Sequence, residues 1–476
     1  MRLPVMRGVL LSAAAGLCGF LAAPALAQTA APAPAASGPA ASAPAAPATS
    51  GTATAPAAAP AAPAAPAAPP PGLWIDGIHF GLQLEGGFTV NPQNPQDGVN
   101  FGRLFDDRAN QPQLNQLMLT INKPTDPNAT GFDWGFKLQG FYGSDARYTH
   151  FLGVFDQAPG PGYENQFDVT EADILLHVPG PTAGGTDMHI GMFPTPLGYE
   201  VIDPSGNPFY SHSYIFNFGI PLKHTGVLAT SHISPLLDLY LGIDTGENTT
   251  FGCCNGDNNG RPAGIIGFGL NMMGGNLTVL ALSHMGPENA TRFLNTFVPP
   301  FNANDYMRYE NDIVVTWKAT DKLTLTTELN LIRDDFLGIF KTGSPSPANA
   351  YGLAQYFSYT LSDNETLNLR AEFYRDPDGV FVAAYPNNVG LGNNNFVGTE
   401  LGLPGAVSVG TPGMSTTYSE FTVGMTFKPN LPKPVTGLLI RPELRIDHAF
   451  GGAHPFGSNF NGQTQVTFAS DFVLTF

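Results

Sequence analysis

The chain has 476 residues, and only 12% of them are Asp, Glu, Lys or Arg. Acidic residues outnumber basic ones by 38 to 21, and the resulting net charge of −17 argues against nucleic acid as a partner. Beyond the amino-terminal segment, no stretch approaches the ~20 apolar residues of a spanning helix, so any membrane crossing must use strands.

The amino terminus has the parts of a secretory signal peptide. Arg2 and Arg7 precede an apolar run that continues to about Ala23, and Ala25-Leu26-Ala27 forms a small-x-small cleavage site. We expect residues 1–27 to be removed, which takes away two arginines and changes the net charge from −17 to −19. Residues 28–72 are almost entirely Ala and Pro without any charge, and we expect a disordered periplasmic linker. The alternative for this linker is a leader without function.

From about Leu73 the sequence shows the two-residue hydrophobic period of half-exposed β-strands. In the last segment, Phe468 and Phe472 share one face, whereas Thr467 and Asp471 share the other. The pattern predicts about sixteen strands, at Gly77–Thr89, Gln116–Asn122, Phe132–Phe141, Val169–Val178, Thr186–Phe193, Thr225–Thr230, Leu236–Asp244, Gly264–Met272, Asn276–His284, Arg308–Lys318, Leu323–Ile332, Tyr351–Leu361, Thr366–Tyr374, Thr416–Phe427, Leu438–Ala449 and Gln463–Phe476.

The joins between these strands alternate in length. Short joins such as Met273–Gly275 and Ala319–Lys322 alternate with long loops such as Pro194–His224 and Arg375–Ser415. Outer-membrane barrels have short periplasmic turns and long external loops, whereas a soluble sandwich has no reason to sort its connections. Residues 73–476 are therefore predicted to form an all-β, transmembrane antiparallel β-barrel in the cell outer membrane, surrounded by the lipid bilayer and lipopolysaccharide.

Charged residues on the strands share one face. A charge on the lipid face near the midplane costs about 2–4 kcal/mol, so we expect these side chains to point into the lumen. They include Arg370, Glu372, Arg441, Glu443, Arg445 and Asp447. A lumen with many ionisable groups needs water, which favours a channel for small hydrophilic solutes over a barrel packed with side chains. Inward acidic positions outnumber basic ones, so the channel is predicted to prefer cations.

The third long loop carries the most informative motifs. Gly198-Tyr199-Glu200 stands in a Pro-rich stretch that follows Gly191-Met192-Phe193, and His224-Thr225-Gly226 opens the next strand. In these features the chain from Leu73 to Phe476 resembles the OmpL-like outer-membrane β-barrel porins. The resemblance implies a porin without naming a solute. It also implies a loop that folds into the pore and makes Glu200, Asp203 and Lys223 candidates for the constriction.

The resemblance to porins also bears on partners and leaves alternatives. The final strand, which ends on the aromatic Phe476, resembles the signal that the barrel-assembly machinery reads, and a homotrimer is possible. The loop could instead cap the outer rim or pack against a neighbouring subunit. A second alternative is a saccharide-selective porin, in which the loop aromatics form a stacking track: Phe193, Tyr199, Phe209, Tyr210, Tyr214, Phe216 and Phe218.

A barrel enzyme such as an outer-membrane phospholipase is the rival class. Asp187 and His189, or Asp447 and His448, supply fragments of a catalytic site but no complete motif, so we expect no enzyme activity. The ten histidines lack a metal-ligand spacing, and we expect wall residues, no metal and no cofactor.

Cys253 and Cys254 are the only cysteines after signal cleavage. In an oxidising compartment they are predicted to form a vicinal disulfide, with an intersubunit bridge as the alternative.

Overall fold

The computed structural model describes residues 77–476 except residues 127–128, 152–153, 156–158, 160–162, 251–258, 290, 296–297, 383–414 and 460. The predicted signal peptide, the Ala/Pro-rich linker and the pair Cys253 and Cys254 lie outside the described residues. Among the described residues, no helix has the length and apolar character needed to cross a membrane.

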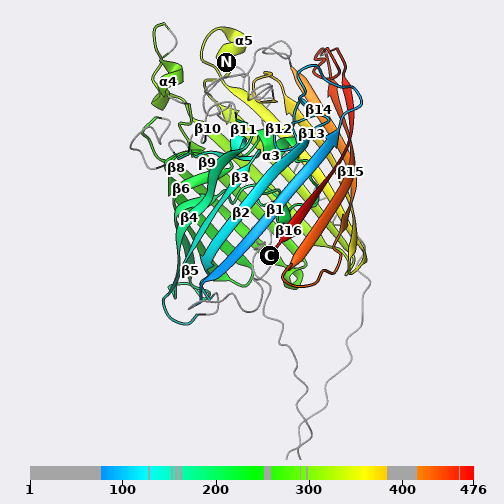
Figure 1. Cartoon of the computed structure of the whole chain (residues 1–476). Helices are drawn as coiled ribbons and strands as arrows, with labels where there is room; N and C mark the ends of the chain where they lie inside the picture. The colour runs from blue at the N-terminus through cyan, green and yellow to red at the C-terminus, as the bar shows by residue number, and fades with distance from the viewer. Residues whose placement is uncertain are drawn as a thin grey trace, which may run out of the picture. The chain divides into compact units, whose positions relative to one another are not determined.

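Sixteen antiparallel strands close into a barrel in which each strand pairs with its neighbours in the chain (Figure 1). The strands are β1 (His79–Val90), β2 (Pro112–Lys123), β3 (Asp133–Gly143), β4 (Gln166–Val178), β5 (Thr186–Pro194), β6 (Lys223–Ser234), β7 (Leu237–Asp244), β8 (Ala263–Met272), β9 (Leu277–Gly286), β10 (Arg308–Lys318), β11 (Leu323–Asp334), β12 (Ala348–Ser362), β13 (Glu365–Asp376), β14 (Thr416–Phe427), β15 (Gly437–Phe450) and β16 (Thr464–Thr475). The predicted fold class and strand number are confirmed.

The last strand closes the barrel against the first. β1 and β16 pair from Gln83↔Thr475 to Val90↔Phe468, and the backbone N–H of Phe476 donates to the Leu82 carbonyl at 2.9 Å. Closure removes both sheet edges, which a bilayer could not satisfy with hydrogen bonds. The final segment therefore pairs with both β1 and β15.

The two faces of the wall have the predicted parity. Large apolar side chains are exposed on the outside, among them Phe373 on β13, Ile440 on β15 and Phe468 on β16. The residues between them, such as Arg370 and Arg441, are buried inside the barrel. This arrangement places the apolar band toward lipid and the charge toward the lumen.

Connections alternate in length, as predicted. The short ones include the two residues between β6 and β7 and η2 (Met273–Gly275) between β8 and β9. At the other end, long loops carry short helices, and Figure 1 shows α4 and α5 there. These helices are α2 (Ala146–Thr149), η1 (Pro204–Gly206), α3 (Tyr214–Phe218), α4 (Thr291–Leu294), η3 (Ala303–Asp305) and α5 (Ile339–Thr342).

Several strands extend beyond their predicted ends. β6 begins at Lys223 and ends at Ser234, whereas alternation alone predicts Thr225–Thr230. β12 begins at Ala348 rather than at Tyr351. Antiparallel pairing continues where a strand has left the lipid, because backbone hydrogen bonds need no apolar alternation there.

Candidate functional site

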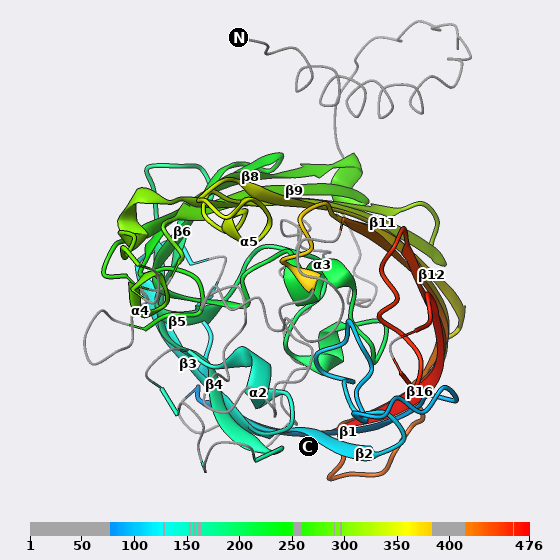
Figure 2. The same ribbon diagram turned by 90° about the horizontal axis from the view of Figure 1, so that it is seen from above.

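The connection between β5 and β6 folds into the barrel, and we call residues 195–222 the inner segment. Figure 2 shows its helix α3 within the ring of strands. Two side chains start its helical turns: the Asp203 carboxylate accepts the Ser205 N–H at 2.9 Å, and the Ser213 hydroxyl accepts the Phe216 N–H at 3.0 Å. The inner segment is thus a locally ordered element that occupies the lumen.

Two carboxylates of the wall accept backbone hydrogen bonds from the inner segment. Glu372 on β13 accepts the N–H groups of Tyr214 at 2.6 Å and Ile215 at 2.8 Å. Glu443 on β15 accepts the N–H groups of Tyr210 at 2.9 Å and Ser211 at 3.2 Å. Each carboxyl group accepts two backbone N–H groups that would otherwise be buried without a partner, so these contacts hold the inner segment against β13 and β15.

Glu200 and Arg370 form the central ion pair of the site. Arg370 Nη1 lies 2.6 Å from Glu200 Oε1 and also donates to the Ser211 carbonyl at 2.8 Å. The other oxygen of Glu200 accepts the Ser213 N–H and faces His212 Nδ1. Burial alone would raise the pKa of Glu200, but the Arg370 guanidinium and His212 lower the pKa to about 2. The carboxylate therefore stays ionised inside the barrel.

Two arginines on β15 donate to carbonyl groups of the inner segment. Arg441 Nη1 donates to Pro204 at 2.6 Å and to Asn207 at 2.7 Å, and Arg445 Nη1 donates to His212 at 2.5 Å. A planar guanidinium can bind two acceptors at once, which suits it to fix a chain without regular secondary structure. These arginines act as anchors of the inner segment rather than as free charges of a pore wall.

Asp447 joins the inner segment to the first long loop. It accepts the Tyr214 hydroxyl at 3.2 Å and pairs with both Arg445 and Arg103, the latter at 2.7 Å. Arg103 lies between β1 and β2 and also donates to Thr467 on β16. Sequence reasoning missed Arg103, because loop residues have no periodicity from which to infer their direction.

Glycines on the inner wall allow the close approach. A Cβ at Gly87 on β1 would lie 2.2 Å from Cζ of Tyr210, and one at Gly352 on β12 would lie 2.3 Å from Cγ1 of Ile215. These distances are shorter than van der Waals contact, so any side chain here would displace the inner segment.

The structure places Asp203 and Lys223 differently from the other candidates. Asp203 is half-buried and accepts a hydrogen bond from Gln83 of β1 at 2.9 Å. Lys223, at the start of β6, is completely buried, pairs with Asp168 of β4 at 2.6 Å and lies over the Phe151 ring. Lys223 thus joins β6 to β4, whereas Asp203 remains partly open to the lumen.

Partly exposed polar groups inside the barrel are found on β5 and β6. The side chains of Asp187 and His189 on β5 are 34% and 40% exposed, and that of His232 on β6 is 30% exposed. In contrast, Arg370, Glu372, Arg441, Arg445 and Asp447 are almost completely buried. The expectation that the inward charges are bathed in water is therefore wrong for these residues, because the inner segment covers them.

The fragments of a catalytic motif do not assemble. Asp447 points inward, whereas its neighbour His448 has the outward parity of β15. Asp187 pairs with His177 at 2.7 Å and with His232 at 3.0 Å, and His189 pairs with Asp173 at 2.6 Å. Neither sequence pair forms a dyad, because adjacent residues of a strand face opposite sides and the carboxylate of Asp187 is engaged elsewhere.

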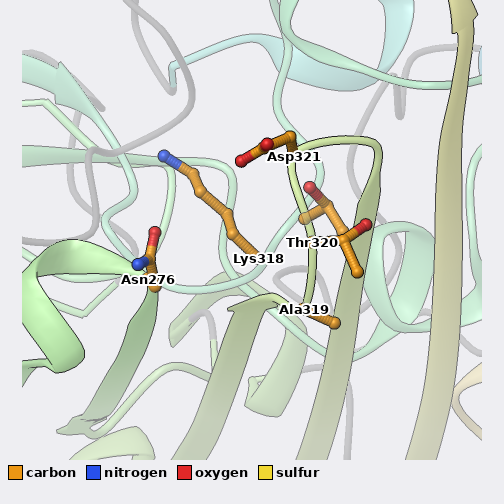
Figure 3. Close-up of a pocket in the computed structure, with 6 residues that line it drawn as sticks. Asn276, Lys318, Ala319, Thr320 and Asp321 are labelled. Atoms are coloured by element: carbon orange, nitrogen blue, oxygen red, sulfur yellow. The ribbon is translucent and has the colours of Figure 1, made fainter.

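A pocket of about 520 Å³ lies at the short-turn end (Figure 3). It is lined by Asn276 beside β9, by Lys318 at the end of β10 and by Thr320 and Asp321 of the turn to β11. Apart from Ala319, its lining side chains are polar. None of its lining residues belongs to the site built by the inner segment.

Comparison with solved structures shows the same fold. The anion-selective porin from Comamonas acidovorans matches with a TM-score of 0.51 and 11% identity, over 84% of this chain and 99% of that chain. OprB of Pseudomonas putida matches with a TM-score of 0.50 and 13% identity, over 84% of this chain and 94% of that chain. At such low identity, the likeness concerns the fold alone.

No curated protein matches the sequence of the chain. A family model does match it over residues 77–476, which is the whole barrel, and its description is "Putative beta-barrel porin-2, OmpL-like". The predicted resemblance is confirmed, and the chain belongs to the OmpL-like β-barrel porin family.

Proposed function

We propose that the protein is an outer-membrane porin through which small hydrophilic solutes diffuse passively. The observation that carries the proposal is the asymmetric position of the inner segment. Apart from the Thr195–His224 contact beside its own ends, its hydrogen bonds to the strands reach β1, β2 and β10 to β15, whereas half-exposed polar groups remain on β5 and β6. The route for solutes then follows the sector beside β5 and β6, and the inner segment narrows it.

Passive diffusion is favoured over saccharide selectivity. A stacking track needs aromatic faces that a sugar can reach. Of the seven aromatic residues in and beside the inner segment, six are buried and only Tyr199 is partly exposed: Phe193, Phe209, Tyr210, Tyr214, Phe216 and Phe218 are the buried ones. These aromatics pack the inner segment, and they leave no continuous track for sugars.

The pore is proposed to prefer cations moderately. Asp187 and Asp203 are partly exposed carboxylates inside the barrel. Fixed negative charge raises the local concentration of cations over a Debye length of about 8 Å at physiological salt. The preference is moderate because many other inward carboxylates pair with arginine.

The reversal potential in a planar bilayer under a KCl gradient tests this proposal. We expect a potential of the sign that indicates potassium preference, and a smaller one for the double variant Asp187→Asn/Asp203→Asn. Asp321→Asn, in a turn at the short-turn end, is the control and should leave the potential unchanged. Chloride preference would contradict the proposed cation preference. Folded protein without conductance would contradict the proposed porin function.

We propose that the first 27 residues direct export and that the final strand takes part in assembly. Residues 1–27 would be cleaved, residues 28–72 would form a periplasmic linker, and Phe476 would contribute to recognition by the barrel-assembly machinery. The mass of the purified protein should correspond to a start at Gln28, and a chain that retains Met1 would contradict cleavage. Native mass spectrometry would decide between a homotrimer and a single barrel in lipopolysaccharide-containing membranes.

Cys253 and Cys254 are proposed to form a vicinal disulfide in the loop between β7 and β8. Alkylation without reductant, followed by intact mass, tests the pair. We expect no modified thiol in native protein and two after reduction. Two modified thiols before reduction would rule out both the vicinal disulfide and an intersubunit bridge.

A further inference from the structure

Three strands near the long-loop end bring two histidines and one aspartate together inside the wall. His224 lies on β6, Asp244 on β7 and His284 on β9, and the three side chains are buried. Their ligand atoms lie within 4.8 Å of one another. His224 Nδ1 is 3.2 Å from Asp244 Oδ2, and His284 Nε2 is 3.3 Å from Asp244 Oδ1.

The hydrogen bonds of this cluster are incomplete. His224 Nδ1 and Asp244 Oδ2 lie 3.2 Å apart without forming a well-aligned hydrogen bond, and neither atom bonds another residue within the described part of the chain. Buried polar atoms without a partner are costly, so native structures rarely keep them. Two orphaned atoms aimed at the same point indicate a ligand between them.

The far nitrogen of each histidine is held by another residue. His224 Nε2 lies 3.0 Å from the Thr195 hydroxyl, and His284 Nδ1 lies 3.1 Å from Glu310 Oε2. When a histidine donates from its far nitrogen to a carboxylate or hydroxyl, its near nitrogen keeps a lone pair for a metal. The lone pairs of both rings would then point toward Asp244.

Charge around the cluster also favours a cation. Buried carboxylates here include Asp244, Glu247, Glu310 and Asp334. Arg308 pairs with two of them, Glu247 at 2.6 Å and Asp334 at 3.0 Å. The remaining two, Asp244 and Glu310, contact the imidazoles of His224 and His284, so a divalent ion bound to neutral imidazoles would balance their charge.

We propose that His224 Nδ1, Asp244 and His284 Nε2 bind one divalent transition-metal ion of the Zn²⁺ class. Ligands about 2.05 Å from a tetrahedral zinc ion are about 3.3 Å apart, which agrees with the two separations observed here. Two imidazoles favour Zn²⁺, Co²⁺, Ni²⁺ or Cu²⁺, whereas Ca²⁺ and Mg²⁺ prefer oxygen ligands. The ion would connect β6, β7 and β9 and, through Thr195, the start of the inner segment.

A similar group on β4 and β5 provides a contrast. Glu171, Asp173 and His189 also bring their ligand atoms within 4.8 Å of one another. There, however, Lys137 Nζ lies 2.6 Å from Glu171, and His189 makes a short contact of 2.6 Å with Asp173. A side-chain cation already serves that group, so His189 is a matched control for a histidine beside carboxylates.

Metal content of the full chain, purified without a histidine tag in detergent, tests the site. After incubation with Zn²⁺ and dialysis, we expect about one zinc per chain in the wild type and in His189→Gln. His224→Gln and His284→Gln should each bind at least tenfold more weakly, because loss of a second-shell partner alone costs 10–100-fold. Heat-modifiable gel migration confirms that each variant is folded.

Co²⁺ absorption of the wild type gives a second readout that needs no variant. We expect d–d bands that Zn²⁺ abolishes. Absence of bound zinc and of cobalt bands in the folded wild type would overturn the proposal. Equal zinc binding by the wild type and both histidine variants would overturn it too, as would loss of zinc in His189→Gln alone.

Discussion

Arg370 and Leu369 are neighbours on β13 with opposite environments. Arg370 is buried and bonds Glu200 and Glu420, whereas Leu369 has the outward parity of the strand. Replacing Arg370 with Ala removes one side of a buried ion pair, at a cost of about 3–5 kcal/mol. Because Glu200 belongs to the inner segment, we expect Arg370→Ala to loosen that segment and to give a folded barrel with larger and noisier conductance.

Leu369→Arg is the matched substitution on the lipid face. A basic residue near the midplane costs about 2–4 kcal/mol, and here it opposes insertion of the barrel itself. We expect reduced assembly, measured as loss of the heat-modifiable band on a gel. A folded Leu369→Arg beside an unfolded Arg370→Ala would show that the two faces of the wall are assigned in reverse.

The ionised Glu200 leads us to expect that the stability of the inner segment depends on pH. Glu200 lies outside the strands that cross the membrane, and its pKa of about 2 is below the ordinary Glu value of about 4.3. Because the pKa of Glu200 is lowered in the folded state, its ionised carboxylate stabilises the folded state at pH values above about 4.3. This contribution is lost as the pH falls from about 4.3 to about 2. Channel noise should therefore rise below about pH 4.

Glu200→Gln serves as the control for this pH dependence. It cannot titrate, so its channel should be noisy at neutral pH and should change less on acidification. Single-channel recordings at pH 7 and pH 3 compare the two proteins. A wild type with identical noise at both values would contradict the stabilising role of the ionised Glu200.

At the residue scale, the sequence predicts direction but not partners. Alternation correctly predicts that Arg370, Glu372 and Glu443 point inward. It cannot predict that Arg370 meets Glu200, because that contact joins two elements far apart in the chain and depends on the path of the inner segment. The burial of these charges follows from the same path.

At the scale of elements, the fit between inner segment and wall depends on small residues. Gly87→Ala would bring a Cβ within 2.2 Å of the Tyr210 ring, which is buried and hydrogen-bonded to Asn115. Overpacking of this kind costs about 1–3 kcal/mol. We expect the inner segment to shift and the conductance to change while the barrel remains folded.

Gly269→Ala on β8 is the control for Gly87→Ala. Its Cβ would meet Tyr240 at 3.4 Å, an ordinary van der Waals distance. Conductance in planar bilayers compares both variants with the wild type. A changed conductance for Gly269→Ala with none for Gly87→Ala would contradict the close packing of Tyr210 against β1.

The strands could be predicted from the sequence, whereas the inner segment's contacts could not. Strand alternation is a local property of each face, so it survives in the sequence of a single element. The contacts of α3 are instead set by tertiary geometry. Its Tyr214 N–H donates to Glu372, and its Ile215 packs against Gly352. The three residues of the proposed metal site come from different strands, which explains why ligand spacing did not predict them.

At the scale of the whole molecule, closure and filling of the barrel act together. Pairing of β1 with β16 closes the wall, and the inner segment then fills one side of the lumen. A filled side leaves a narrower route than an empty sixteen-stranded barrel would. In our proposal, water and ions pass beside β5 and β6.

Thiol modification of single channels tests this claim most directly. In a background with Cys253 and Cys254 changed to Ser, His189→Cys places a thiol on the lumen side of β5, and Ile190→Cys places one on the lipid side. A cationic methanethiosulfonate reagent should lower the conductance of His189→Cys and leave that of Ile190→Cys unchanged. Folded His189→Cys protein that conducts ions but is unaffected by the reagent would contradict the proposed route.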